Sequence, residues 1–273
     1  IVEHRSLAAK GESVETAIAG IDVTGDMSGP LIYGAYDDFF ESLLQGTWTS
    51  NVLKSGKDTQ TLTVENAIAA GAGGTNTMAR YQGVEATGGS ITLTSNADAT
   101  FAFDLLGMGS SDTATSALGS STYTDQTERT PLSCGIDVGT IAFDGYTLDA
   151  FESATINFNY EGREAQNKLG SVFTKNGITK GALLPEITAR VYVDANFAAL
   201  YNAARDSDHS LFSVTFPLGS VSNKKYTLVF PKCKFISSNL DFTAENAMQE
   251  VSIRAMYDEA TEDASVKLTR AVS

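Results

Sequence analysis

The sequence predicts a mainly β fold with a small helical share (α+β), built as two tandem β-sandwich or open-barrel modules, each flanked by one short α-helix. One observation is that the order strand, short amphipathic helix, strand and long β-hairpin occurs twice along the 273 residues. Another is that the strands of both copies alternate between apolar and polar residues, which gives each strand one buried and one solvated face. We expect an N-terminal arm, a first module, a linker with a connecting strand and a second module at residues 1–17, 18–110, 111–147 and 148–273.

The first module opens with a strand in which Ile21, Val23 and Met27 alternate with polar residues. A helix is predicted next, because apolar residues recur at the spacing of one helical face, at Tyr36, Phe39, Phe40, Leu43 and Leu44. Acidic residues at 37 and 38 suit its first turn, and Gly46 suits its C-terminal end.

A strand with Leu62 and Val64 follows the first helix, and a hairpin closes the module. In this hairpin, Ile91 and Leu93 face a second strand across the polar turn SNADA, and that strand carries Phe101, Phe103 and Leu105.

The second module repeats this order. Its first strand alternates through Ile187, Ala189, Val191 and Val193, and its helix, with Asp194 as N-cap and Arg205 near its end, carries Phe197, Leu200, Tyr201 and Ala204. A strand with Phe212, Val214 and Phe216 comes next. The final hairpin is predicted to pair Leu240 and Phe242 with Val251 and Ile253 across the turn AENAM.

Three stretches lack apolar periodicity. The Gly-rich residues 69–79 suggest a long loop of the first module, and the Ser/Thr/Gly-rich residues 107–133 suggest the boundary between modules. Residues 161–185 form a third irregular stretch, and long loops of this kind are often binding elements.

Composition limits the possible functions. Hydrophobic residues make up 42% and charged residues 19%, which is enough apolar material for a folded core. No run of about 18 apolar residues is present, so we expect no membrane-spanning helix. The net charge of −14 argues against a grip on nucleic acid phosphates, which needs clustered Lys and Arg. We expect the only two cysteines, Cys134 and Cys233, to be free thiols.

No residue pattern indicates catalysis, a metal or a cofactor. His4 and His209 are too few for a His-based metal site or a catalytic triad, and the cluster Asp206, Asp208 and His209 is best explained as a polar turn. The run GAGG at 71–74 lacks the Lys-Ser/Thr of a phosphate-binding loop. Adjacent Asp37 and Asp38 point in different directions on a helix, so they make no catalytic pair.

One family resemblance is carried by specific residues. Residues 33–54 read YGAYDDFFESLLQGTWTSNVLK, which resembles the tail tube proteins of tailed bacteriophages, where a Tyr-Asp-Asp-led helix leads to a Gly-Thr-Trp turn and an Asn-Val-Leu-Lys strand. The resemblance extends to QTLTVENAI at 60–68 and to residues 81–111, and more weakly to residues 226–260. The resemblance does not include the rest of the 107–133 stretch after residue 111, and it does not include residues 161–185.

The resemblance implies a β-sandwich or open barrel with a flanking helix, and a structural role without catalytic residues or cofactors. Subunits of such proteins form rings, the rings stack, and DNA leaves the capsid through the bore. The implied type is a siphophage major tail protein in the virion tail, assembled in the host cytoplasm. Expected partners are further copies of the chain and other tail proteins (tape measure, tail terminator and distal tail). DNA is expected to pass without specific binding, and no membrane partner is expected.

Because six-fold rings are usual in the family and each chain has two modules, we predict a homotrimeric ring with pseudo-six-fold symmetry. The polar faces of the strands are the candidates for the lumen, because an acidic or neutral wall does not hold DNA. These candidates are Asp22, Thr24, Asp26, Thr92, Thr94, Asp104, Glu186, Thr188, Asp241, Thr243 and Glu250. Arg190 and Arg254 share these faces, and we expect them to pair with acids. The N-terminal arm and residues 161–185, with Lys168, Lys175 and Lys180, are the candidates for contacts between rings.

Two other classes of protein remain open on the sequence alone. A cell-surface adhesin or carbohydrate-binding β-sandwich would explain the acidic charge and the Ser/Thr/Gly loops, but not the paired helices. An enzyme on a β scaffold is disfavoured by the missing catalytic constellation. A tube from a gene-transfer particle or a secretion device is not distinguishable from a phage tube by sequence.

Overall fold

The computed structural model describes residues 2–7, 13–71, 74–116, 118–120, 124, 126, 128, 130–144, 150–193, 201–203, 205, 211–241 and 246–271, with side chains from residue 20 onward. Within them the chain forms the α-helix α1 (Asp37–Leu44) and a 3-10 turn at Leu118–Ser120. The strands are β1 (Val2–Leu7), β2 (Ser13–Gly20), β3 (Val23–Pro30), β4 (Val52–Lys54), β5 (Leu62–Ile68), β6 (Thr77–Thr94), β7 (Thr100–Gly107), β8 (Gly109–Ala114), β9 (Ala142–Phe143), β10 (Phe151–Glu161), β11 (Ala165–Gln166), β12 (Gly177–Ile178), β13 (Ala182–Tyr192), β14 (Phe212–Leu218), β15 (Lys225–Asp241), β16 (Met248–Ala255) and β17 (Lys267–Ala271).

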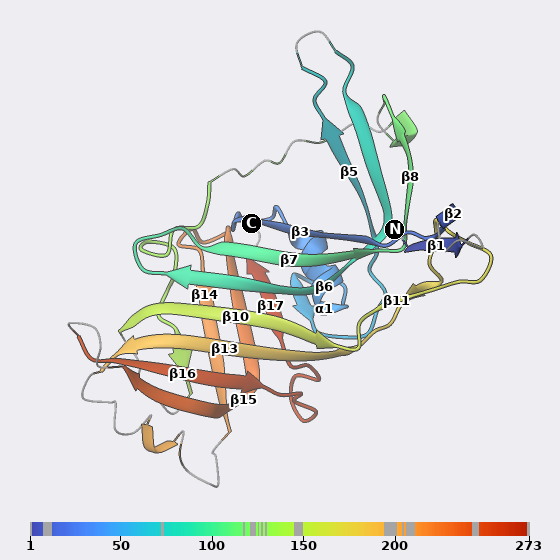
Figure 1. The fold of residues 1–273 in the computed structure, drawn as a ribbon. Helices are drawn as coiled ribbons and strands as arrows, with labels where there is room; N and C mark the ends of the chain where they lie inside the picture. The colour runs from blue at the N-terminus through green and yellow to red at the C-terminus, as the bar shows by residue number, and fades with distance from the viewer. Residues whose placement is uncertain are drawn as a thin grey trace.

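Most strands belong to one antiparallel sheet that runs through both halves of the chain. Its strand order is β3-β7-β6-β10-β13-β16-β15-β14-β9, and β4, β5, β8 and β17 branch from this path. The first seven strands of the path form the main layer, in which β7, β6, β10, β13 and β16 lie side by side in Figure 1. β10 connects the halves, because it pairs with β6 on one edge and with β13 on the other.

A second group of strands covers one face of the main layer. We call β14, residues 225–233 of β15, and β17 the covering sheet; β14 and β17 pair with opposite edges of β15, and β17 also pairs with β4 of the first half. Phe216 and Phe230 of the covering sheet are fully buried, and the Phe230 ring lies 6.4 Å from that of Phe158 on β10. A single buried cluster therefore includes residues from both halves of the chain.

The first helix packs through its aromatic side onto the main layer. The ring of Phe40 meets that of Phe103 on β7 edge-on at 5.4 Å, and Phe39 stacks on the same ring at 5.7 Å. The helix ends at Gln45, which adopts the left-handed conformation expected of Gly46. Gly46 is required for another reason: a Cβ there would lie 2.2 Å from the carbonyl oxygen of Lys54.

The two halves repeat the same strand arrangement, including its irregularities. β3, β7 and β6 stand in the same spatial order as β13, β16 and β15. In β6, Thr87 is an extra residue between the pairs Ala86–Leu105 and Gly88–Asp104, and in β15, Ile236 is an extra residue between Phe235–Ile253 and Ser237–Ser252. Because a β-bulge is a specific local feature, its occurrence at matching positions is strong structural evidence for duplication.

The match continues beyond the bulges. Leu62 and Val64 of β5 pair with Val84 and Tyr81, and Phe212 and Val214 of β14 pair with Cys233 and Phe230 with the same spacing. By this register β5 corresponds to β14, and β8, on the other edge of β6, corresponds to β17. The predicted fold class, mainly β with two copies of one arrangement, is confirmed.

The copies differ in where their outer strands lie. We call β5, residues 77–84 of β6, and β8 the projecting sheet, because it extends away from the rest of the chain in Figure 1. The strand β8 falls in a stretch that the sequence pattern leaves irregular, since its residues GSSDTA lack apolar alternation. A strand that is wet on both faces gives no periodic signal.

Several predicted segments acquire definite structure. The arm forms a β1–β2 hairpin, and the irregular stretch after β10 contains the short β11–β12 hairpin. Residues 201–203 and 205 are helical, so Tyr201 lies on a helix, whereas Phe197, Leu200 and Ala204 lie outside the described residues. No helix among the described residues is long and apolar enough to cross a membrane.

Final-hairpin pairing differs from the prediction. Leu240 lies opposite Gln249, and Val251 lies opposite Ser238, because the last pair of the hairpin is Asp241–Met248, so the connection begins earlier than the predicted turn AENAM; Phe242 is outside the described residues.

Candidate lumen face and assembly surfaces

The face of the main layer that points away from the core carries a continuous row of small hydroxyl side chains. Residues directly opposite each other in antiparallel strands place their side chains on the same face. The register aligns one such residue on each of six neighbouring strands: Thr100, Thr92, Thr155, Thr188, Ser252 and Ser237. We call this the hydroxyl row, and the face that carries it the polar face. The alternate residues of the same strands, such as Ile156, Ile187 and Ile253, are fully buried.

Charged and amide residues flank the hydroxyl row on both sides. One flanking row reads Ser90, Asn157, Glu186, Arg254 and Lys234 across the strands, and the other reads Thr94, Ser153, Arg190, Glu250 and Asn239. Sequence reasoning missed Thr100, Thr155, Ser237 and Ser252, although β10 alternates plainly through Ala154, Ile156 and Phe158. The polar residues between those three positions were the available signal.

Both arginines of the polar face lie beside carboxylates. The Arg190 guanidinium is 3.2 Å from Glu152 and 3.1 Å from Asp241, and the Arg254 guanidinium is 3.8 Å from Glu186. All five side chains are about one-third to one-half exposed, so these ion pairs add little stability. Their effect on this face is to balance positive charge locally.

The remaining lumen candidates fall into distinct environments. Asp26 lies directly opposite Asp104 at the β3 end of the layer, and both are exposed. Asp22 is held by the Lys175 ammonium at 2.5 Å, and that hydrogen bond lowers the pKa of the Asp22 carboxyl. Thr24 is exposed on β3, and Thr243 lies outside the described residues.

The two ends of the main layer have edges available for pairing. Among the described strands, β3 pairs with β7 alone, and the C-terminal part of β15, residues 237–241, pairs with β16 alone. An unpaired edge presents free backbone donors and acceptors, which invites pairing with another strand.

The junction between the halves is built on Asp37 in the first turn of α1. Its carboxylate accepts a hydrogen bond from the hydroxyl of Tyr226 on β15 and pairs with the guanidinium of Arg270 on β17. Burial and the neighbouring Asp37 charge raise the pKa of Tyr226 far above its usual value. Arg270 also lies 4.5 Å over the ring of Trp48, so the covering sheet of the second half is anchored to the helix of the first.

A buried ion pair ties β6 to the segment after β10. Arg163 and Glu85 meet at 2.6 Å with side chains 1% and 2% exposed, and the guanidinium lies 4.8 Å from the Tyr160 ring. The two residues are 78 positions apart, and no local pattern in the sequence marks either one.

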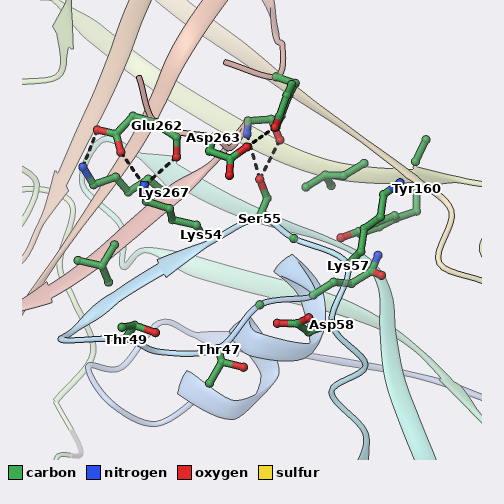
Figure 2. Close-up of a pocket in the computed structure, with 18 of the residues that line it drawn as sticks. Thr47, Thr49, Lys54, Ser55, Lys57, Asp58, Tyr160, Glu262, Asp263 and Lys267 are labelled. Carbon is green, nitrogen blue, oxygen red and sulfur yellow. Dashed lines mark hydrogen bonds and ion pairs between the residues drawn. The ribbon is translucent and has the colours of Figure 1, made fainter. Parts of the chain in front are cut away.

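A large groove of about 1060 Å³ opens between the end of α1, β4, the start of β13 and the segment 257–267 (Figure 2). Three of its charged groups are engaged with each other: Glu262 accepts from Lys267 at 2.7 Å and lies 3.1 Å from Lys54. Ser55 bonds to the backbone nitrogen of Ser265 at 3.0 Å on the same wall. This wall of the groove is therefore polar and internally paired.

The lysines proposed for contacts between rings have unequal surroundings. The Lys175 ammonium is held by Asp22 and Asn167, and that of Lys180 bonds to Thr59, whereas Lys168 is exposed. Beside Lys168 the same loop carries Leu169, which is 100% exposed, and Phe173, which is 56% exposed.

No group of three or more His, Cys, Asp or Glu side chains within the described residues could hold a metal ion. Asp206, Asp208 and His209 lie outside that part of the chain. Both cysteines are free thiols, Cys134 half-buried and Cys233 fully buried.

The described residues thus form a duplicated antiparallel fold whose main layer has one buried face and one polar face. The phage tail tube protein family matches the chain over residues 12–266. The chain therefore belongs to the phage tail tube protein family and is a structural component of a phage tail, which sets aside the adhesin alternative. No curated protein matches the chain.

Proposed function

We propose that this chain is the repeating subunit of a siphophage tail tube, in which rings stack into a conduit that carries DNA from the capsid to the host during ejection. The observation that carries the proposal is the polar face, which runs unbroken across six strands of both halves and has the uncharged hydroxyl row at its centre. In a tube this face is the wall of the bore.

The composition of the polar face suits a sliding polyanion. Each unpaired Lys or Arg on a wall adds a phosphate contact that has to be broken in transit. Here Arg190 and Arg254 are neutralised by adjacent carboxylates, Lys234 in one flanking row adds a positive charge, and Asp26, Asp104 and Glu250 add negative charge. Such a wall repels phosphates over about 8–10 Å at physiological salt, so DNA passes without specific binding.

The duplication supports a ring of three chains with pseudo-six-fold symmetry. Each chain contributes two copies of the same strand arrangement joined through β10. The edges of β3 and of residues 237–241 lie at opposite ends of the main layer, so repeated head-to-tail pairing between copies closes the layer into a ring. This closure removes both exposed edges at once.

Stacking of rings is assigned to the loop at 162–181 and the N-terminal arm. The exposed apolar Leu169 and Phe173, beside Lys168, supply a contact surface that a lone chain leaves in water. Because Arg163 at the start of the loop is part of a buried pair, substitutions that test stacking are placed at the exposed Leu169 and Phe173.

Electron microscopy of purified, concentrated protein tests the conduit, and native mass spectrometry of isolated rings tests the stoichiometry. Hollow stacked rings of three chains are expected. A lone chain, or rings with another number of chains, would contradict the proposal. Replacing Leu169 and Phe173 with Ser is expected to give rings that no longer stack, with Ile136→Ser as a control because Ile136 is also exposed, at 76%, but lies outside this loop.

The bore assignment has a separate test. Tubes that carry Thr92→Lys and Thr188→Lys are expected to bind DNA with a steep salt dependence, with a slope of about −0.9 per added phosphate contact. Tubes with lysines at exposed Thr63 and Ala67, on the outer face of the projecting sheet, are the control and should not retain DNA. Equal DNA retention by both variants would contradict the assignment of the polar face to the wall of the bore.

Further partners on this proposal are the tape measure, tail terminator and distal tail proteins, with assembly in the host cytoplasm and final location in the virion tail.

A further inference from the structure

The two outer sheets of the chain are equivalent in register but different in surroundings. Glu65 and Asn66 of β5 pair with Arg80 and Ala79, as Thr215 and Phe216 of β14 pair with Val229 and Leu228. Ile68 pairs with Thr77, as Leu218 pairs with Tyr226. The projecting sheet of the first half is therefore the structural counterpart of the covering sheet of the second half.

The covering sheet shows where such a unit binds. It does not sit on its own half alone: β17 pairs with β4, and Tyr226 and Arg270 both bind Asp37 on α1. The hydroxyl of Tyr33 also donates to the carbonyl of Ala271. The outer sheet of the second half is thus held by the helix side of the half that precedes it in the main layer.

If the outer sheet of the first half binds in the same way, its partner has to belong to another chain. The half that would precede β3 in the main layer is absent from the same chain, because β3 is the end strand of the layer. The projecting sheet accordingly extends away from the body at the β3 end of the main layer (Figure 1). Among the described strands, β8 pairs with β6 alone, and its further backbone contact is an isolated bridge from Gly109 to Thr174, whereas its counterpart β17 pairs with a strand on each edge.

We propose, on the basis of the ring described above, that the projecting sheet binds the second half of the neighbouring chain in the same ring, as the covering sheet binds the first half of its own. The occupant of this surface is a second copy of the chain. Each ring then contains one outer sheet per module, half of them folded onto their own chain and half clasping the next one.

The residue chemistry of the two sheets agrees with this division. Positions that are fully buried in the covering sheet, Phe216, Tyr226 and Leu228, correspond to Asn66, Thr77 and Ala79 in the projecting sheet. A sheet that folds onto its own chain is never exposed to water for long, so its inner face can be aromatic. A sheet that waits for another subunit has to stay soluble, which small and polar residues allow. Ile68, the counterpart of the buried Leu218, stays apolar and is 53% exposed, so it offers an apolar contact to the neighbouring chain.

Site-specific photo-crosslinking tests this contact. A photoreactive amino acid at Asn66, on the inner face of the projecting sheet, or at Asp112, on β8, is expected to produce a two-chain product in isolated rings. The linked peptide is expected to map to residues 148–273 of the other chain. Because both positions are exposed, neither substitution should disturb folding. The same amino acid at Thr188 in the hydroxyl row is the control and should give no two-chain product.

The outcomes separate this contact from the ring itself. Intact rings without the linkage, or a linkage that forms only in stacked tubes and is lost when they are dissociated into rings, overturn the clasping contact and leave the tube assignment standing. Failure to observe any ring by native mass spectrometry overturns the tube assignment and this contact together.

Discussion

The hydroxyl of Tyr226 donates a hydrogen bond to the carboxylate of Asp37, which lies 189 positions earlier in the chain. This bond joins the covering sheet of the second half to the first turn of the helix in the first half. The same carboxylate pairs with Arg270, and the backbone nitrogen of Gly34 donates to the Tyr226 oxygen at 2.8 Å. The phenol is therefore both donor and acceptor in a site that is almost fully buried.

The raised pKa of Tyr226 predicts loss of stability at high pH. A folded-state pKa above the unfolded value of about 10 gives a contribution that is fully present below pH 10 and is lost as the pH rises. The free energy of unfolding should fall above about pH 10, by up to about 1.4 kcal/mol per pH unit for this group. Denaturant unfolding between pH 8 and 11 measures it. Tyr226→Phe should reduce the slope but not abolish it, because the pKa values of Tyr33, Tyr36 and Tyr160 are raised as well. An unchanged slope would contradict the assignment.

Gly46→Ala is predicted to destabilise the fold. The added Cβ would lie 2.2 Å from the Lys54 carbonyl oxygen, so the turn after α1 has to move away from β4. We expect a cost of about 1–3 kcal/mol, in the range of overpacked sites. Gly25→Ala is the matched control, since nothing lies within 4 Å of a Cβ at that position. Thermal unfolding of both variants measures this difference. Equal unfolding midpoints would show that the turn after α1 accommodates the added Cβ without cost.

Removing one partner of the buried pair Arg163–Glu85 is predicted to lower the free energy of unfolding, because the other partner stays buried without its counter-charge. Arg163→Met leaves an unpaired carboxylate in a site only 2% exposed, and we expect a loss of about 3–5 kcal/mol. The double variant Arg163→Met, Glu85→Leu should recover much of this loss, because no uncompensated charge is left buried. Denaturant titration of the two single variants and the double variant measures the coupling. Additive losses would mean that the pair acts through packing alone.

The two thiols are predicted to react at very different rates. Burial raises the pKa of Cys233 to about 12, and burial also raises that of the half-buried Cys134. With a pKa of about 12, only about one Cys233 thiol in ten thousand is ionised at pH 8. A colorimetric thiol reagent should therefore modify Cys134 slowly and Cys233 only when the protein unfolds. Rapid modification of Cys233 in Cys134→Ser protein would show that the covering sheet opens.

The regular part of the fold was accessible from the sequence because strict alternation marks half-buried strands. The apolar positions of β13, at Ile187, Ala189 and Val191, are all buried. The first helix was accessible through its aromatic spacing, and Ile91 pairs with Phe101 as expected from the hairpin. These features depend on residues close together in sequence.

Features that depend on distant residues were not accessible. Nothing local marks Arg163 as the partner of Glu85, and the bulges at Thr87 and Ile236 are visible only in the pairing register. The hydroxyl row required the strand order, in which β10 stands between β6 and β13. β8 escaped prediction because its exposed residues give no periodic pattern.

β10 also has a mechanical consequence. Backbone hydrogen bonds along both of its edges join the halves, so the two copies share one continuous sheet. When a tail curves, the strain must be taken up where separate polypeptides meet, and each subunit turns as a rigid plate.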